Sequence, residues 1–243
     1  MKDHLMDLIS HTYDLGFITC VKITGTDKET RIDSIAEDKS VILSATLASP
    51  MAEFIGLFGM PNLDKLKILL NLQEYRENAD INIVKQDRNG IDTPVGLHFT
   101  NATKDFQNNY RFMSAEIISE TIKTAKFKGA NWAVTITPAV SAIQRLKMQA
   151  QANSDIPVFQ TRTRNKNLVI SFGDHSTHTG EFVFEQGVGG ALNNAWKWPV
   201  KQIISILDLV GDKTLRICDD GIMEIVVDSG LAVYSYSLPA HSK

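Results

Sequence analysis

The sequence predicts an α+β protein built from two similar units, each with two helices packed on antiparallel sheet. Three observations favour this fold class: strand-like runs dominate the 243 residues, four segments have helical spacing, and the two kinds of segment follow one another in an order that repeats. Turn signals at Asn89-Gly90, Asp220-Gly221 and Ser229-Gly230 are typical of antiparallel meanders.

The expected strands alternate apolar and polar residues or concentrate β-branched and aromatic side chains. They are Ile18–Ile23, Ser40–Thr46, Ile81–Gln86, Val95–Thr100, Tyr110–Met113, Trp132–Thr137, Val158–Arg162, Asn167–Phe172, Glu181–Glu185, Thr214–Cys218, Met223–Val227 and Ala232–Ser237.

Helical spacing occurs over 3–14, 62–72, 138–153 and 199–209. In the third segment Thr137 is expected to cap the helix and Pro138 to occupy its first position, where the missing N–H costs nothing. Its apolar face is expected to hold Val140, Ile143 and Leu146.

The first two helices begin roughly 60 residues apart, and so do the last two, which indicates a structural repeat. We therefore expect an N-terminal domain over 1–114, a connector over 115–128 and a C-terminal domain over 129–243.

Composition excludes several protein classes. Apolar residues make up 43% and charged residues 22% of the chain, and no segment has the ~20 apolar residues of a membrane span. The net charge of −3 argues against a protein that coats nucleic acid with its whole surface, but it allows a local basic surface. Cys20 and Cys218 lie in apolar runs and are expected to be free, buried thiols. Nothing at the N-terminus indicates export.

At the level of the whole chain the pattern resembles the sliding clamps of DNA polymerases. It is most similar to the trimeric clamps of tailed bacteriophages, whose architecture is that of the archaeal and eukaryotic proliferating cell nuclear antigens. The resemblance rests on element order and on Glu53-Phe-Ile-Gly-Leu-Phe, Asn62–Leu72, Ala139-Val-Ser-Ala-Ile-Gln-Arg-Leu, Trp198-Pro-Val-Lys-Gln-Ile-Ile and Ala232-Val-Tyr-Ser-Tyr-Ser-Leu-Pro. It implies the DNA clamp fold and a homotrimeric ring, with no enzymatic activity, cofactor or metal.

Such a ring encircles duplex DNA without reading its sequence, so its helices need diffuse positive charge on their solvent faces. A single lysine on a helix is more often simply solvated, and the joint placement of several is what favours this role. The expected DNA-facing residues are Lys2, Lys65, Lys67, Arg145, Lys147 and Lys201.

The resemblance also implies a head-to-tail contact between Phe106–Met113 of one subunit and Thr179–Gln186 of the next. The interface residues would be Phe106, Tyr110, Phe112, Phe182 and Phe184, of which Phe182 and Phe184 are equally well explained as core residues.

Partner proteins of sliding clamps carry short peptides that dock near the connector and the C-terminus. Here the pocket would involve Ile117, Ile118, Ile122, Val233, Leu238 and Pro239, although a packed connector explains each residue about as well. The implied partners are a DNA polymerase, a clamp loader ATPase and transcription factors, and no association with a membrane is expected. The implied location is the cytoplasm of an infected bacterial host.

Two other functions stay open. A β-rich viral tail or capsid protein could use the same strand edges for assembly. A metal hydrolase could use Asp174, His175 and His178, although the flanking Gly173 and Gly180 favour a polar hairpin loop. Asp219-Asp220-Gly221 lacks the remaining ligands of a calcium loop and is interpreted as a turn.

Overall fold

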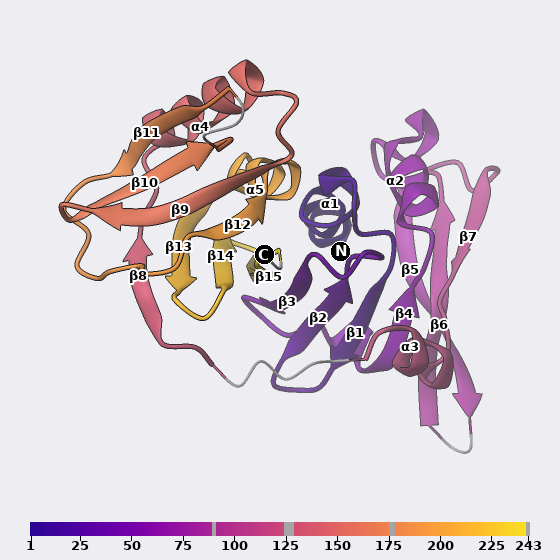
Figure 1. Ribbon diagram of the computed structural model, residues 1–243. Coiled ribbons are helices and arrows are strands. Elements are labelled where there is room, and N and C mark those ends of the chain that lie inside the picture. Colours follow the sequence, from indigo (N-terminus) through magenta and orange to yellow (C-terminus); the bar gives the residue numbers. More distant parts are fainter. Residues whose placement is uncertain (89–90, 124–128, 175–177, 242–243) are drawn as a thin grey trace. The chain divides into compact units, whose positions relative to one another are not determined.

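The computed structural model of the chain (Figure 1) describes residues 1–88, 91–123, 129–174 and 178–241. Its helices are α1 (Lys2–Ser10), α2 (Leu63–Asn71), α3 (Ala115–Thr121), α4 (Val140–Ala152) and α5 (Val200–Leu207), with short 3-10 helices at Tyr13–Leu15, Ala52–Phe54 and Gln73–Tyr75. Its strands are β1 (Val21–Gly25), β2 (Thr30–Ile35), β3 (Ile42–Leu47), β4 (Gly56–Met60), β5 (Asp80–Arg88), β6 (Ile91–Thr100), β7 (Gln107–Arg111), β8 (Trp132–Ile136), β9 (Val158–Arg164), β10 (Asn167–Phe172), β11 (Gly180–Glu185), β12 (Trp196–Pro199), β13 (Asp212–Cys218), β14 (Ile222–Asp228) and β15 (Ala232–Pro239).

The chain forms two compact units. The N-terminal unit comprises Met1–Lys126 with Ser229–Tyr234, and the C-terminal unit comprises Phe127–Asp228 with Ser235–Lys243. The N-terminal unit therefore also includes α3, which was expected to belong to a connector, and Ser229–Tyr234, which was expected to belong to the C-terminal domain. Residues 124–128 of the expected connector lie outside the described residues.

The N-terminal unit holds two antiparallel arrays, β4-β1-β2-β3 and β5-β6-β7. Helices α1 and α2 contact each other and bury Leu5, Leu8 and Leu66. The segment Ser229–Tyr234 adjoins the end of β3, where Ala48 donates an N–H hydrogen bond of 2.8 Å to the Leu231 carbonyl.

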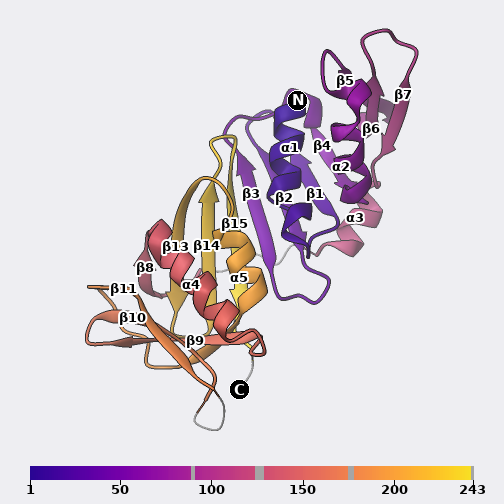
Figure 2. The same ribbon diagram turned by 90° about the horizontal axis from the view of Figure 1, so that it is seen from above.

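The C-terminal unit repeats this arrangement. Its strands β12-β9-β10-β11 pair in the order of β4-β1-β2-β3, and β13-β14-β15 follow α5 as β5-β6-β7 follow α2. Equivalent strands also pair at equivalent positions, since Val21 on β1 pairs with Met60 on β4 and Phe159 on β9 pairs with Trp198 on β12. A proline follows both Met60 and Trp198 and precedes the next helix, α2 or α5. Helices α4 and α5 run side by side (Figure 2). The predicted α+β class with two similar units is thus confirmed.

Several local expectations were wrong. Three strands were not predicted: β2 is rich in polar residues, β4 contains glycine at both ends of its apolar run, and β12 is too short to show alternation. α4 begins at Val140 without a side-chain cap, so Thr137 does not cap it, and Val140 is 75% exposed instead of packed. Both cysteines are free, with Cys218 buried and Cys20 half-buried.

Candidate nucleic-acid-facing helices and strand edges

Positive charge is concentrated on four helices. α1, α2, α4 and α5 together carry six basic and three acidic side chains, a net charge of +3, whereas the whole chain carries −3. The remainder of the chain is therefore net acidic. An asymmetry of this kind favours contact between a polyanion and each helix pair, although Asp14 and Asp208, which follow α1 and α5, offset one of the positive charges in each unit.

Lys65 and Lys201 are the freest of the predicted DNA-facing residues. Lys65 lies in the first turn of α2 and Lys201 in the first turn of α5, and both are exposed. Within the described residues, neither makes a hydrogen bond or an ion pair. Each ammonium group is consequently available to a phosphate without displacing another partner.

Lys67 and Lys147 are held in ion pairs. Lys67 on α2 lies 2.8 Å from Asp14, which follows α1, and Lys147 on α4 pairs with Asp208, which caps α5. The hydrogen bond to Asp14 holds the pKa of the Lys67 ammonium above its usual value. These two lysines differ from Lys65 and Lys201, because a phosphate would compete with a carboxylate for each of them.

Lys2 and Arg145 are bound to the backbone. Lys2 donates hydrogen bonds to the carbonyls of Tyr75, at 2.6 Å, and Arg76, at 3.0 Å. Arg145 donates to the Val183 carbonyl at 3.2 Å, and its guanidinium lies 5.2 Å from the centre of the Phe182 ring. Both cations thus fasten a helix to its own unit, a role that helical spacing does not reveal.

The predicted interface residues divide between core and surface. Tyr110, Phe182 and Phe184 are buried, and Tyr110 donates its hydroxyl to the Pro61 carbonyl. Phe112 is half-buried and stacks on Phe58 with ring centroids 4.5 Å apart. Only Phe106, at 40% exposure, is a substantially exposed aromatic residue of this set. Within a single chain, Phe182 and Phe184 are therefore core residues, which was the alternative explanation for them.

β7 and β11 are nevertheless open strand edges. Among the described residues, β7 has only β6 as a neighbouring strand and β11 only β10. Each edge therefore leaves backbone N–H and C=O groups that can pair with a further strand.

Each of the two edges carries one charged residue without an ion-pair partner in the described chain, and these two residues have opposite charge. Arg111 on β7 is exposed, and β11 presents Glu181 and Glu185. Arg111 and Glu185 have no ion-pair partner in the described part of the chain, whereas Glu181 pairs with Arg162 and Arg164. These charges were not predicted, because the expected interface was based on the aromatic residues of both strands.

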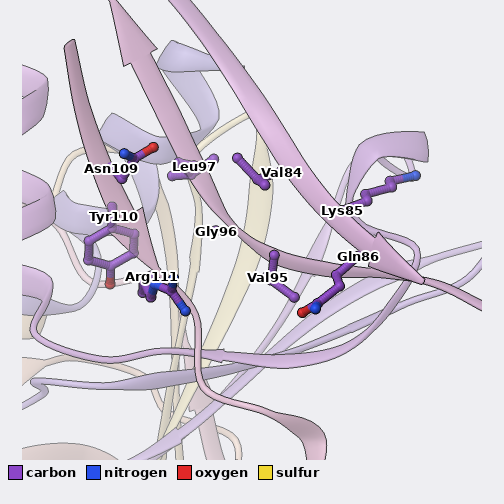
Figure 3. A pocket seen from close by; sticks show the side chains of 9 residues that line it. All are labelled: Val84, Lys85, Gln86, Val95, Gly96, Leu97, Asn109, Tyr110 and Arg111. Carbon is purple, nitrogen blue, oxygen red and sulfur yellow. The ribbon is translucent and has the colours of Figure 1, made fainter. Parts of the chain in front are cut away.

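A shallow depression of about 390 Å³ adjoins the β7 edge (Figure 3). Gly96 on β6 lacks a side chain between Val84 on β5 and Arg111 on β7, which leaves the gap. A Cβ atom at Gly96 would come within 2.6 Å of the Tyr110 carbonyl oxygen, so glycine is required there.

The predicted peptide-pocket residues are not all available to a ligand. Ile118, Ile122 and Leu238 are buried, and Ile118 packs against Gly59. Ile117 and Val233, 52% and 42% exposed, and Pro239 remain at the surface.

The other candidate sites gain no support. His175 lies outside the described residues, and no group of three or more metal-ligating side chains occurs within them. The Asp219 carboxylate accepts N–H bonds from Asn193 and Asn194, and the bond from Asn194 foremost holds its pKa below the usual range. Its Oδ1 atom thus holds the segment before β12 against the turn after β13. No helix in the described ranges has the length and apolar character needed to span a membrane.

Comparison with solved structures identifies the architecture. The chain is similar to the proliferating cell nuclear antigen of Thermococcus kodakaraensis, with 12% identity, a TM-score of 0.70, and coverage of 99% of this chain and 97% of that one. That of A. fulgidus, solved with the C-terminal region of FEN-1 bound, has 10% identity, a TM-score of 0.69, and coverage of 100% and 95%. This chain has the DNA clamp fold. The clamp of Entamoeba histolytica gives 11% identity, a TM-score of 0.66, and coverage of 99% and 94%.

No protein-family model and no curated protein matches the chain. The resemblance to sliding clamps is confirmed in architecture, since the match spans nearly the whole chain and nearly the whole of each clamp.

Proposed function

We propose that this protein is a sliding clamp that encircles duplex DNA and tethers a replicative DNA polymerase. The observation that carries the proposal is the net charge of +3 on the four helices of a clamp fold whose chain is net acidic. Diffuse lysines on helices suit non-specific, salt-sensitive contact with phosphates, which allows sliding. Catalysis is no part of this role.

The ring would be a homotrimer closed by β7 of one subunit against β11 of the next. Pairing unlike edges places Arg111 opposite the strand that carries the unpaired Glu185, whereas pairing β11 with itself would bring two copies of Glu185 together. A head-to-tail contact that closes on itself makes a ring. The buried Tyr110, Phe182 and Phe184 would support these two edges from within each unit.

Partner proteins would dock through short peptides. The C-terminal region of FEN-1 binds the A. fulgidus clamp. By analogy, the exposed apolar residues Ile117, Val233 and Pro239 are the first positions to test for peptide binding. We further propose a clamp loader ATPase and transcription factors as partners, and a bacteriophage origin with action in the host cytoplasm.

The test combines molar mass with DNA topology. Light scattering across a concentration series is expected to give a mass of three chains. Protein loaded on circular DNA is expected to be retained and to be released once the circle is cut. A monomer, or an open-ended polymer indifferent to DNA topology, would refute the clamp and favour a viral structural protein.

A further inference from the structure

The ion pairs of Lys67 and Lys147 follow one scheme in both units. In each, an aspartate that follows one helix of the pair binds a lysine on the other helix, with Asp14 in the 3-10 helix after α1 and Asp208 directly after α5. The Lys67 and Asp14 side chains are 44% and 37% exposed, and those of Lys147 and Asp208 are 29% and 61% exposed. Both pairs are therefore open to solvent and to a competing anion.

An exposed ion pair is weak and exchanges readily, so a phosphate can replace the carboxylate. In this exchange the lysine loses its ion pair with the aspartate. The aspartate then lies close to the phosphate, and the two negative charges repel each other. A lysine paired in this way therefore adds less to DNA affinity than the unpaired Lys65 or Lys201. Low affinity for each phosphate is what a protein that slides on DNA requires.

We propose that Asp14 and Asp208 are positioning residues that limit DNA affinity by occupying Lys67 and Lys147. The inference rests on the proposed function, since it concerns the phosphate contacts of the helices. It predicts that removing either aspartate makes binding tighter and more dependent on salt.

The experiment measures the affinity for a short linear DNA duplex by fluorescence anisotropy across a salt series, with the variants Asp14→Asn, Lys67→Gln and their double. Each additional phosphate that the protein neutralises steepens the plot of log K against log salt by about 0.9. Asp14→Asn is expected to steepen the slope by at least about 0.9, and the double variant to return it to the wild-type value. The Asp208→Asn and Lys147→Gln cycle repeats the test in the other unit.

Asp3→Asn is the matched control. Asp3 is exposed on α1 and has no ion pair or hydrogen bond with the described chain, so its removal changes the net charge equally without releasing a lysine. The inference would be overturned if Asp14→Asn gave the same slope as Asp3→Asn, or if the double variant kept the steep slope. Neither result would affect the proposed function. Wild-type protein without salt-dependent duplex binding would overturn the proposed function and the inference with it.

Discussion

The substitution Asp7→Asn tests how the N-terminal unit holds the segment Ser229–Tyr234. Asp7 on α1 accepts hydrogen bonds from the Tyr234 hydroxyl at 2.8 Å and the Ser229 hydroxyl at 3.0 Å. Its other oxygen lies 3.2 Å from Nδ1 of His11, which stacks on Tyr234 with centroids 4.2 Å apart. Nδ1 also lies 2.8 Å from the Asp7 carbonyl, which can only accept, so this nitrogen carries the proton.

An asparagine cannot accept all three bonds, because one of its terminal atoms is an NH2 donor. With its Oδ1 toward the two hydroxyls, the asparagine would turn its NH2 group toward Nδ1–H of His11, and leaving this buried NH2 donor unpaired costs about 1–3 kcal/mol. The remaining bonds would be weaker by roughly 1 kcal/mol in total without the charge of the carboxylate. The Asp7 side chain is only 12% exposed, so water does not replace the missing acceptor fully. We expect a destabilisation of about 3 kcal/mol, which lowers the Tm by roughly 6–12 °C.

The assay is thermal and urea unfolding at pH 7, followed by circular dichroism, with Asp3→Asn as the exposed control on the same helix. The control is expected to stay within about 0.5 kcal/mol of wild type. A destabilisation by Asp7→Asn no larger than that of the control would refute the reasoning.

The dependence of stability on pH provides a second test of the role of the Asp7 carboxylate. Burial raises the pKa of Asp7, but the hydrogen bonds from His11, Tyr234 and Ser229 outweigh it and hold the pKa below the usual 3.8. The stabilisation is therefore complete above pH 3.8 and is lost as the pH falls through the lower folded-state value. The difference between wild type and Asp7→Asn should narrow below pH 3.8.

Three further predictions concern DNA, assembly and thiol reactivity. Lys201→Gln should flatten the salt slope of duplex binding by about 0.9, the amount expected for one phosphate; an unchanged slope would remove this residue from the DNA-facing set. Arg111→Glu should raise the concentration needed for trimers at least tenfold by light scattering, since it places like charges at the proposed edge; Lys28→Glu, in an exposed turn, is the control, and equal effects would contradict the proposed edge. Burial raises the pKa of Cys20 to about 11 from 9.0, so alkylation at pH 8 should be roughly a hundredfold slower than in urea; equal rates would contradict its burial.

Most of the architecture could be predicted from the sequence, because it depends on patterns that are local in the chain. The four helices were found by apolar spacing, and most strands by alternation. β2 was missed because Asp33 and Ser34 are polar yet buried in the sheet, where Ser34 donates to the Cys20 carbonyl and Asp33 accepts from Ser44. Such burial becomes favourable only when partners distant in sequence satisfy the polar groups.

The candidate site was less predictable than the fold. Helical spacing correctly identified the lysines as surface residues, but it treated Lys65 and Lys67 as equivalent. Only the packing of α1 against α2 brings Asp14, 53 positions away, to Lys67. The aromatic residues of the strand edges likewise look alike in sequence, and the structure separates Phe106 at the surface from Phe182 and Phe184 in the core.

Sequence patterns alone predict the fold class, the repeat and the concentration of basic residues on four helices. These follow from the periodicity and charge of neighbouring residues, which are properties of the chain alone. The folded chain is needed to see which cations are free, which strand edges are open and which apolar residues are exposed. Each of these depends on contacts between segments far apart in sequence, which periodicity does not encode.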